Sequence, residues 1–344
     1  MTMSSSVRRI AAAVAVASTL IAGSVSVGSP HNAAASALPS PAARSVTFVT
    51  DVGGLNDNGF NHLGYLGTLS GAKSAGYSAH YIETTSQADY VKNLTSAAQQ
   101  SRLVVAVGFS FATALTTVAA KYPSDHFVII DYNYIPSPKN VQGNIFKPEQ
   151  SSYLAGILAA GLSKTHKVGF VGGIKGPIID AFYAGFQAGA RAYDPTIKVI
   201  GAYTGSFVDQ SVGATTAQQE IGAGADIIYA AAGGSGLGAL AAANQHHLYS
   251  IGVDADQHGL HPQTVITSAV KHVEVAVAEA IVADGKGQFR SGTRYWDLAD
   301  NGVGLASYHN LSNVVSSKVQ HAISQATRDI TTGKIKVPTS PTTN

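Results

Sequence analysis

Polar and aromatic residues follow a predicted strand near the start of the chain, in a pattern that suits binding of a small molecule. Residues 46–61 read VTFVTDVGGLNDNGFN, in which a β-branched and aromatic run ends at Asp51, a glycine turn follows, and Phe60 begins a helical pattern. In open α/β sheets, ligands bind outside the carboxyl ends of the strands, beside helix N-termini. The alternative is that the glycines only form a turn and Asp57 only caps the helix. The candidate binding residues of this stretch are Asp51, Asp57, Asn58, Phe60 and Asn61.

Similar side chains lie just past other predicted strands. If two sheets point their carboxyl ends into one crevice, these groups converge on the same ligand. Carboxylates accept hydrogen bonds from hydroxyl groups, and phenyl faces stack on planar bases or sugars, so a neutral ring-containing or polyhydroxylated ligand is indicated. Individually, each group has a turn or cap role as its alternative. The further candidates are Phe109, Ser110, Asp131, Phe207, Asp209, Gly233, Gly234, Asp254, Asp256 and Lys271.

Motifs for catalysis or for phosphate binding are incomplete. Residues 108–112 (GFSFA) resemble a nucleophile elbow but end in alanine instead of glycine, and no histidine has a distinguishing context. Residues 233–238 (GGSGLG) lack the G-x-G-x-x-G spacing, and no G-x-x-x-x-G-K-[ST] occurs. His258 and His261 are a weak zinc signal because they fall in a predicted loop. We therefore expect a binding protein and not an enzyme, with no metal and no cofactor.

The composition favours a compact α/β protein, with 45% hydrophobic and 12% charged residues among 344. The formal net charge is +2 and no Lys/Arg run occurs, so nucleic acid is not an expected partner. Cysteine is absent, which excludes disulfides and a lipidated N-terminal cysteine. No covalent lipid anchor is therefore expected.

The start of the chain has the pattern of an export signal. An arginine pair precedes the apolar run 10–16, and small residues with A-x-A spacing follow. This pattern is typical of a secretory signal peptide and is too short for a spanning helix. We expect a signal peptide over residues 1–37, cleaved near Ala35 or Ala37, and a linker over 38–45. The protein is then exported, and either secreted or associated with the cell envelope.

Apolar strands alternate with helical patterns along the rest of the chain, which predicts parallel sheets covered by helices. The predicted strands are 46–49, 79–82, 103–107, 127–130, 168–171, 199–203, 227–231, 249–253 and 265–266. This rhythm indicates two similar halves, and the late elements must complete one sheet or the other. The expected division is a first lobe of residues 46–148 and 269–292, a second lobe of 149–268 and 293–312, a C-terminal helix within 313–337 and a tail of 338–344.

Nine ordered motifs between residues 46 and 335 together resemble the basic membrane protein family, the purine nucleoside receptors of ABC transporters. The motifs are D-x-G-G-x-x-D-x-x-F-N (51–61), V-G-F (107–109), I-D (130–131), G-F-V-G-G (169–173), F-x-x-G-F-x-A-G-A (182–190), G-S-F-x-D (205–209), A-A-G-G-x-G-x-G (231–238), I-G-V-D-x-D-Q (251–257) and T-S-x-x-K (267–271).

The resemblance implies a type I periplasmic-binding fold, in which two doubly wound lobes are joined by three hinge crossings and close on a ligand. By motif, Phe60 and Phe207 would sandwich the base. The residues implied at the base edge are Asp57, Asn61 and Asp131, and those implied at the ribose are Asp254, Lys271 and the backbone of Gly233 and Gly234. Asp51 would support the loop or touch the ligand, and Phe109 would line the pocket.

We expect an extracytoplasmic protein that captures a nucleoside, with a purine nucleoside favoured, for ABC-type uptake or sensing. The resemblance implies an ABC permease as partner. Family members commonly carry a lipid-bearing cysteine after the signal peptide, so the lack of cysteine here favours a freely secreted protein or one held in the envelope by other contacts. Two alternatives stay open: a secreted nucleosidase or hydrolase that uses the same crevice, and a binding protein for a sugar or another small polar ligand.

Overall fold

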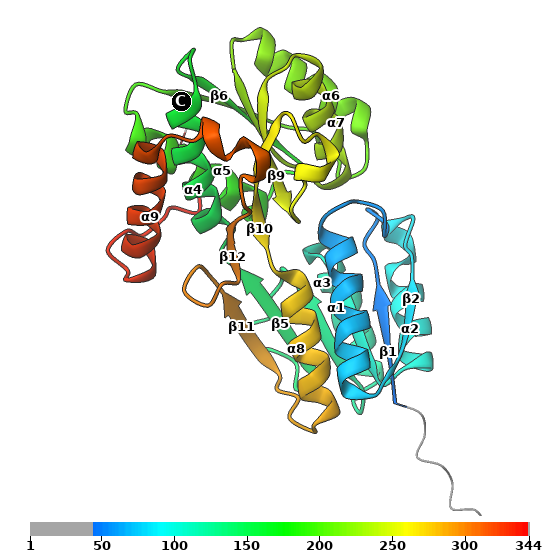
Figure 1. Cartoon of the computed structure of the whole chain (residues 1–344). Helices are drawn as coiled ribbons and strands as arrows, with labels where there is room; N and C mark the ends of the chain where they lie inside the picture. The colour runs from blue at the N-terminus through cyan, green and yellow to red at the C-terminus, as the bar shows by residue number, and fades with distance from the viewer. Residues whose placement is uncertain (1–43, 343–344) are drawn as a thin grey trace, which may run out of the picture. The chain divides into compact units, whose positions relative to one another are not determined.

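The computed structural model describes residues 44–342, in which strands and helices alternate as predicted (Figure 1). These residues form two six-stranded sheets, ordered β11-β5-β4-β3-β1-β2 and β12-β10-β9-β8-β6-β7. Neighbouring strands are parallel except for β10 and β12, which are antiparallel. The strands are β1 Ser45–Val49, β2 Ser78–Ile82, β3 Leu103–Val107, β4 His126–Ile130, β5 Val141–Phe146, β6 Lys167–Gly172, β7 Lys198–Tyr203, β8 Ile227–Ala231, β9 Tyr249–Asp254, β10 Val265–Lys271, β11 Gly292–Trp296 and β12 Val303–Leu305.

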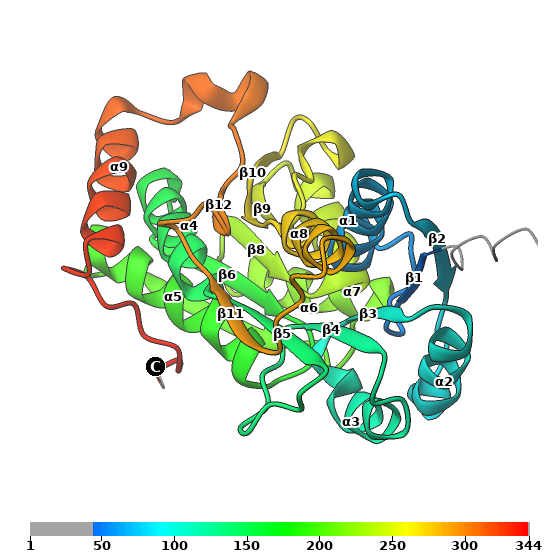
Figure 2. The ribbon, with the colours of Figure 1, turned by 90° about the horizontal axis from the view of Figure 1, so that it is seen from below.

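Helices cover both faces of each sheet, as Figure 2 shows from below. Helices α1 and α8 pack together on one face of the first sheet, with α2 and α3 on the other. On the second sheet the pairs are α4 with α5 and α6 with α7, and α9 packs on α4. The helices are α1 Phe60–Ala75, α2 Tyr90–Gln100, α3 Ala112–Lys121, α4 Pro148–Leu162, α5 Pro177–Tyr193, α6 Gln210–Gly222, α7 Gly233–Gln245, α8 Val273–Gly285 and α9 Ser317–Thr331.

The central strands are buried on both faces, which is why they read as unbroken apolar runs in the sequence. Every residue of β3 and of β8 is buried. The outer strands are different: β5, the second strand of its sheet, carries Gln142 and Asn144 between its apolar residues, and the edge strand β11 exposes Arg294 and Tyr295. The sequence did not predict β5, β11 or β12 as strands, because each lies near the edge of a sheet and lacks a continuous apolar run.

Three short segments carry the chain between the sheets and form the hinge. The chain crosses at Lys147, at His272 and between Asp297 and Gly302. The crossings are bonded to one another: the Lys147 ammonium lies 2.8 Å from the Asp297 carboxylate, and the His272 amide donates to the Gly302 carbonyl at 2.9 Å. The fold class is confirmed as two doubly wound parallel-sheet lobes joined by a hinge.

The positions of these crossings shift the expected lobe boundaries. Residues 269–271 still belong to β10 of the second sheet, and residues 293–296 pair with β5 in the first sheet. The sequence assigned both segments to the opposite lobe. The boundary is hard to predict because the residues that pair with β11 lie about 150 positions earlier in the chain.

Glycines allow the paired helices to approach closely. A Cβ added at Gly189 of α5 would overlap the carbonyl oxygen of Tyr153 in α4, and one at Gly238 of α7 would overlap that of Gln210 in α6. These two glycines therefore allow close helix–helix contact on the second sheet. Among the helices of residues 44–342, none combines the length and the hydropathy that crossing a bilayer requires. The expected signal peptide and linker fall almost wholly on residues 1–43, outside the described residues.

Candidate functional site

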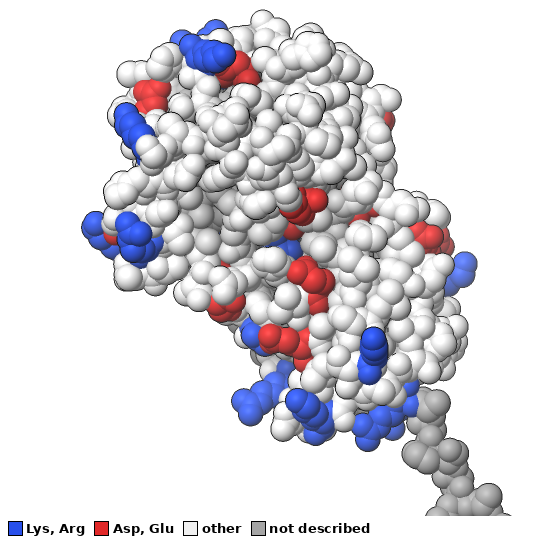
Figure 3. Space-filling view, viewed as in Figure 1, with Lys and Arg blue, Asp and Glu red and all other residues white. Residues whose placement is uncertain are grey.

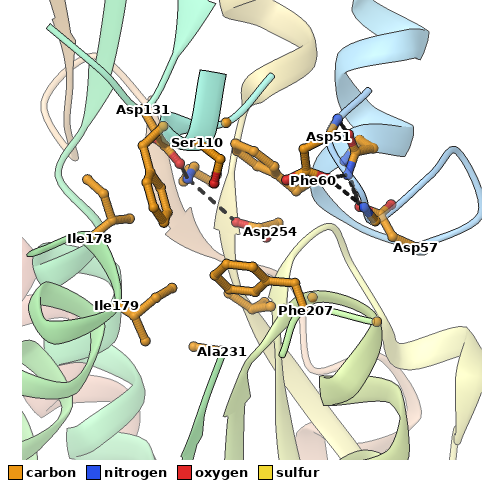
Figure 4. Close-up of a pocket in the computed structure, with 18 of the residues that line it drawn as sticks. Asp51, Asp57, Phe60, Ser110, Asp131, Ile178, Ile179, Phe207, Ala231 and Asp254 are labelled. Carbon is orange, nitrogen blue, oxygen red and sulfur yellow. Dashed lines mark hydrogen bonds and ion pairs between the residues drawn. The ribbon is translucent and has the colours of Figure 1, made fainter. Parts of the chain in front are cut away.

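A pocket with a cavity volume of about 60 Å³ lies where the carboxyl ends of the two sheets face each other (Figure 4). This volume is below the roughly 300–1,000 Å³ that is usual for small-molecule sites, so a ligand can be accommodated only if the two lobes move apart. All eleven residues that the family motifs assign to the ligand are among those that line it, whereas three other candidates of the strand-end pattern, Asn58, Asp209 and Asp256, are not. The lining residues are Asp51, Gly53, Asp57, Phe60, Asn61, Gly108, Phe109, Ser110, Asp131, Ile178, Ile179, Phe182, Phe207, Ala231, Gly233, Gly234, Val253, Asp254 and Lys271.

Lys271 forms a buried ion-pair centre in this pocket. It is the last residue of β10, and its side chain is 2% exposed. Its ammonium donates to Oδ2 of Asp131 at 2.6 Å and lies 3.9 Å from Oδ1 of Asp254. The ammonium also lies 4.5 Å from the centre of the Phe60 ring, a cation–π distance. The sequence placed Lys271 at a strand–helix junction after a short strand, whereas β10 extends to Lys271 and points it inward.

The two aspartates around Lys271 hold matching positions in the two lobes. Asp131 directly follows β4 in the centre of the first sheet, and Asp254 ends β9 in the centre of the second. Both have left-handed backbones, with φ of 66° and 62°. Few non-glycine residues adopt this conformation, and such strain clusters at functional sites. Oδ1 of Asp131 and Oδ1 of Asp254 are buried without a hydrogen-bond partner in the described part of the chain, so they remain free to accept from a ligand.

Asp57 and Asn61 form a hydrogen-bonded clamp at the start of α1. The Asp57 carboxylate accepts from the backbone amides of Gly59, Asn61 and His62 at 2.7–3.1 Å. The Asn61 side chain donates to Asp51 and Asp57 at 2.7 and 3.0 Å and accepts from the Asp51 amide at 3.0 Å. Because both amide protons of Asn61 are used, a ligand would have to displace one of these bonds. The structure thus gives Asp57 the capping role that the sequence left open, while also placing it at the pocket.

Aromatic rings enter the pocket from both lobes. Phe60 begins α1 in the first lobe, Phe207 lies between β7 and α6 in the second, and Figure 4 labels both at the pocket. Phe109, which follows β3, contacts Phe207 edge to face with ring centres 6.3 Å apart. The predicted aromatic residues therefore lie on opposite walls of one pocket.

Backbone groups complete the site on the second lobe. Gly233 and Gly234 begin α7, and Gly233 has a left-handed backbone with φ of 54°. A Cβ at either glycine would lie 3.0–3.2 Å from the carbonyl oxygen of Phe207, so glycine lets the helix start approach this loop. The N-cap residue of α7 is Ala232, whose side chain provides no capping hydrogen bond. The first amides of this helix are therefore candidate hydrogen-bond donors at the pocket that Gly233 and Gly234 line.

Several lining residues were not selected from the sequence. Ile178, Ile179 and Phe182 belong to α5, whose N-terminal half forms an apolar wall of the pocket. Their apolar spacing is also that of an ordinary core-facing helix, so periodicity alone could not separate them. Gly53, Gly108, Ala231 and Val253 lie within two residues of selected ones, and proximity to the strand ends was the available signal.

Metal and hydrolase chemistry lack support in the described residues. No group of three or more His, Asp or Glu side chains among residues 44–342 has the geometry of a metal site. His258 is buried and contacts the Val265 carbonyl at 2.7 Å, away from the pocket. Ser110 lines the pocket, but no histidine of the described residues does. The arrangement can bind and enclose a ligand through rings, carboxylates and an ammonium group.

Burial shifts the acid–base behaviour of the pocket carboxylates. It raises the pKa of Asp51 to about 6 and that of Asp254 to about 7, where the Lys271 charge opposes the rise. Such a group keeps its proton in the folded state at pH values where the unfolded chain has released it. Acidification from pH 8 to 5 therefore stabilises the ligand-free fold through Asp254.

Urea unfolding at the two pH values tests this raised pKa of Asp254. The free energy of unfolding of the wild-type protein should increase more between pH 8 and pH 5 than that of Asp254→Asn. An equal or smaller increase in the wild-type protein would contradict the raised pKa.

Comparison with known proteins agrees with this geometry. Residues 44–340 match the family described as ABC transporter substrate-binding protein, PnrA-like (Bmp). The chain is 35% identical over 315 residues to the ABC transporter nucleoside-binding protein BmpA of Lactococcus lactis subsp. cremoris, covering 84% of this chain and 88% of that protein. It is 34% identical over 315 residues to basic membrane protein D of Borreliella burgdorferi, covering 86% and 88%.

The chain is also similar to a solved structure. The ABC transporter solute-binding protein from Aeropyrum pernix K1 has a TM-score of 0.80 and 28% identity, covering 86% of this chain and 93% of that one. The family match spans both lobes and the hinge, and so includes every element that lines the pocket. The chain therefore belongs to the PnrA-like (Bmp) family of ABC transporter substrate-binding proteins.

Proposed function

We propose that this substrate-binding protein captures a purine nucleoside between its two lobes. The observation that carries the proposal is the combination of phenyl rings on opposite walls with carboxylates and an ammonium group buried between them. A nucleoside has the matching chemistry, because its base presents two flat faces and its ribose presents vicinal hydroxyls. A relative named as a nucleoside-binding protein covers most of the chain, which supports the same ligand class.

The base stacks between Phe60 and Phe207, one ring from each lobe. This arrangement lets the ligand itself join the lobes, so binding and closure are coupled. The base edge meets Asp131, whose Oδ1 is free to accept, and Asp51. The roles that the family resemblance gives Asp57 and Asn61 would act mainly through their clamp, which fixes the position of Phe60.

The ribose hydroxyls donate to Asp254 and accept from Lys271 and the amides of Gly233 and Gly234. Carboxylate hydrogen bonds are charge-assisted and favour hydroxyl donors over analogues that lack them. A 2′,3′-dideoxynucleoside leaves the buried acceptor of Asp254 without a partner, which is the costly outcome. Selectivity against dideoxynucleosides is therefore expected to exceed selectivity among purine bases.

The cellular role that fits this ligand is delivery of a nucleoside to an ABC permease or its sensing outside the cytoplasm. An exported protein, secreted or held in the cell envelope, is the form that such a role requires. On the face in Figure 3, Lys and Arg side chains are scattered singly or in small groups. A continuous basic stripe for nucleic acid is not present on that face.

The test is a thermal-shift screen of the mature protein against nucleosides, free bases and sugars. Selective binding to the folded state raises the melting temperature with ligand concentration over Kd. We expect shifts with inosine, guanosine or adenosine and none with free bases or dideoxynucleosides. A shift with sugars alone would retain the fold and reject the nucleoside.

The same samples test the enzymatic alternative. A nucleosidase in this pocket would release free base from inosine or guanosine, whereas a binding protein returns the nucleoside intact. We expect no free base by liquid chromatography after prolonged incubation at substrate excess. Base release that scales with protein concentration and disappears in Asp254→Asn would replace the binding proposal with hydrolysis.

A further inference from the structure

A hydrogen bond outside the pocket joins the two lobes. The side-chain amide of Gln257, in the second lobe, donates to the backbone carbonyl of Asn58, in the first lobe, at 3.1 Å. Neither residue lines the pocket. Gln257 follows β9 and is 4% exposed, so the bond lies at the closed junction of the lobes.

The second lobe fixes the orientation of the Gln257 side chain. Its Oε1 accepts from the Val253 amide at 3.0 Å, and its own backbone amide donates to Oγ of Ser268 at 3.0 Å. With the oxygen committed to Val253, the NH₂ group must point toward the first lobe. The position requires one acceptor and one donor on the same planar group, which glutamine supplies and glutamate at neutral pH does not.

The first lobe presents the matching acceptor on a rigid turn. Asn58 has a left-handed backbone with φ of 50°, and the Asp57 clamp holds the residues that follow it. Gly59 is buried against the second lobe, where its Cβ position would be 3.8 Å from Nε2 of Gln257 and 3.9 Å from Cβ of Asp254. Phe60 comes next and lines the pocket. Holding the Asn58 carbonyl therefore also holds Phe60 over the site.

We propose that Gln257 is a positioning residue that latches the lobes closed over the ligand and so sets the rate of ligand release. The inference rests on the proposed ligand capture, because a latch matters only if the lobes open and close. The latch forms after the ligand has entered. Its loss accelerates dissociation and leaves association nearly unchanged.

Gln257→Glu is the sharpest variant. It keeps an oxygen for the Val253 amide but places a carboxylate oxygen against the Asn58 carbonyl. Loss of one hydrogen bond corresponds to about a three- to tenfold change in a rate or equilibrium constant. We therefore expect inosine to dissociate about tenfold faster from this variant at pH 8. Protonation of the glutamate restores a donor, so the ratio of mutant to wild-type dissociation rates should fall toward one as the pH falls to 5. Gln257→Met lacks the donor at every pH and should show a raised ratio that does not fall.

The matched control is Gln320→Glu. Gln320 donates its side-chain amide to the Val315 carbonyl at 2.8 Å, the same chemistry within the second lobe. We expect wild-type dissociation at both pH values. Dissociation from the wild-type protein is measured at the same pH values, so that effects of Asp51 and Asp254 titration cancel in the ratio of mutant to wild-type rates.

A ligand-free readout separates the latch from the identity of the ligand. The chain has no cysteine, so Thr85→Cys and Ser211→Cys place one spin label on an exposed residue of each lobe. We expect Gln257→Glu at pH 8 to shift the label distances toward longer values. If the wild-type protein fails to bind inosine, the nucleoside proposal fails. The label distances alone then test whether Gln257 holds the lobes closed. Unchanged distances together with unchanged dissociation rates would overturn it.

Discussion

Asp254→Asn is expected to weaken inosine binding by about 100-fold or more while leaving the fold intact. Asp254 is buried in the pocket with a free Oδ1, and a ribose hydroxyl bonded to this carboxylate loses a charge-assisted hydrogen bond when the charge is removed. The substitution preserves shape and eliminates the cost of keeping a buried charge. Binding should therefore fall in calorimetry while the unfolding free energy at pH 8 does not. Asp254→Ala is expected to abolish inosine binding.

The matched control for Asp254→Asn is Asp256→Asn. Asp256 lies two residues away, contacts His309 at 2.6 Å and is not among the pocket residues, so inosine affinity should stay unchanged. The pH dependence adds a second check, because protonation of Asp254 removes the acceptor that the ligand uses. Inosine affinity should fall as the pH drops through about 7, opposite in sign to the stability effect. Wild-type affinity in Asp254→Asn would reject the ribose role.

Lys271→Met is expected to destabilise the protein by about 3–5 kcal/mol at pH 8, the usual cost of removing one partner from a buried ion pair. Lys271 is 2% exposed and is paired with Asp131, and its loss leaves two buried carboxylates without a counter-charge. Burial raises the pKa of Asp254 to about 7, so protonation of Asp254 below this pH relieves part of the cost. The deficit in urea unfolding should therefore shrink between pH 8 and pH 5.

Two comparisons test this explanation. Lys147→Met removes a half-exposed ion pair with Asp297 at the hinge, and such pairs contribute within about 1 kcal/mol. Lys271→Met combined with Asp131→Asn should recover much of the lost stability, because the second change removes a stranded charge. A deficit in Lys271→Met that is independent of pH and unrelieved by Asp131→Asn would show that packing, not charge, is responsible.

The sequence alone determined the position of the site along the chain. Strands buried on both faces appear as apolar runs, and their ends are marked by glycine, Asp51, Asp254 and the aromatic residues that follow. Because ligands of open α/β sheets bind at those ends, the local pattern selected the strand ends, and the family motifs reduced its candidates to eleven residues that the structure brings into one pocket. The ordered motifs likewise identified the family.

The tertiary structure decided how those residues are used. Lys271 meets Asp131 from 140 positions away, and Gln257 meets Asn58 from 199 positions away. The same structure commits Asp57 to a clamp at the start of α1. Local sequence specifies a strand end or a helix start, but it carries no record of which distant group will face it. Pairing across the hinge depends on where the chain crosses between the sheets, and the closed arrangement of the lobes fixed these partners.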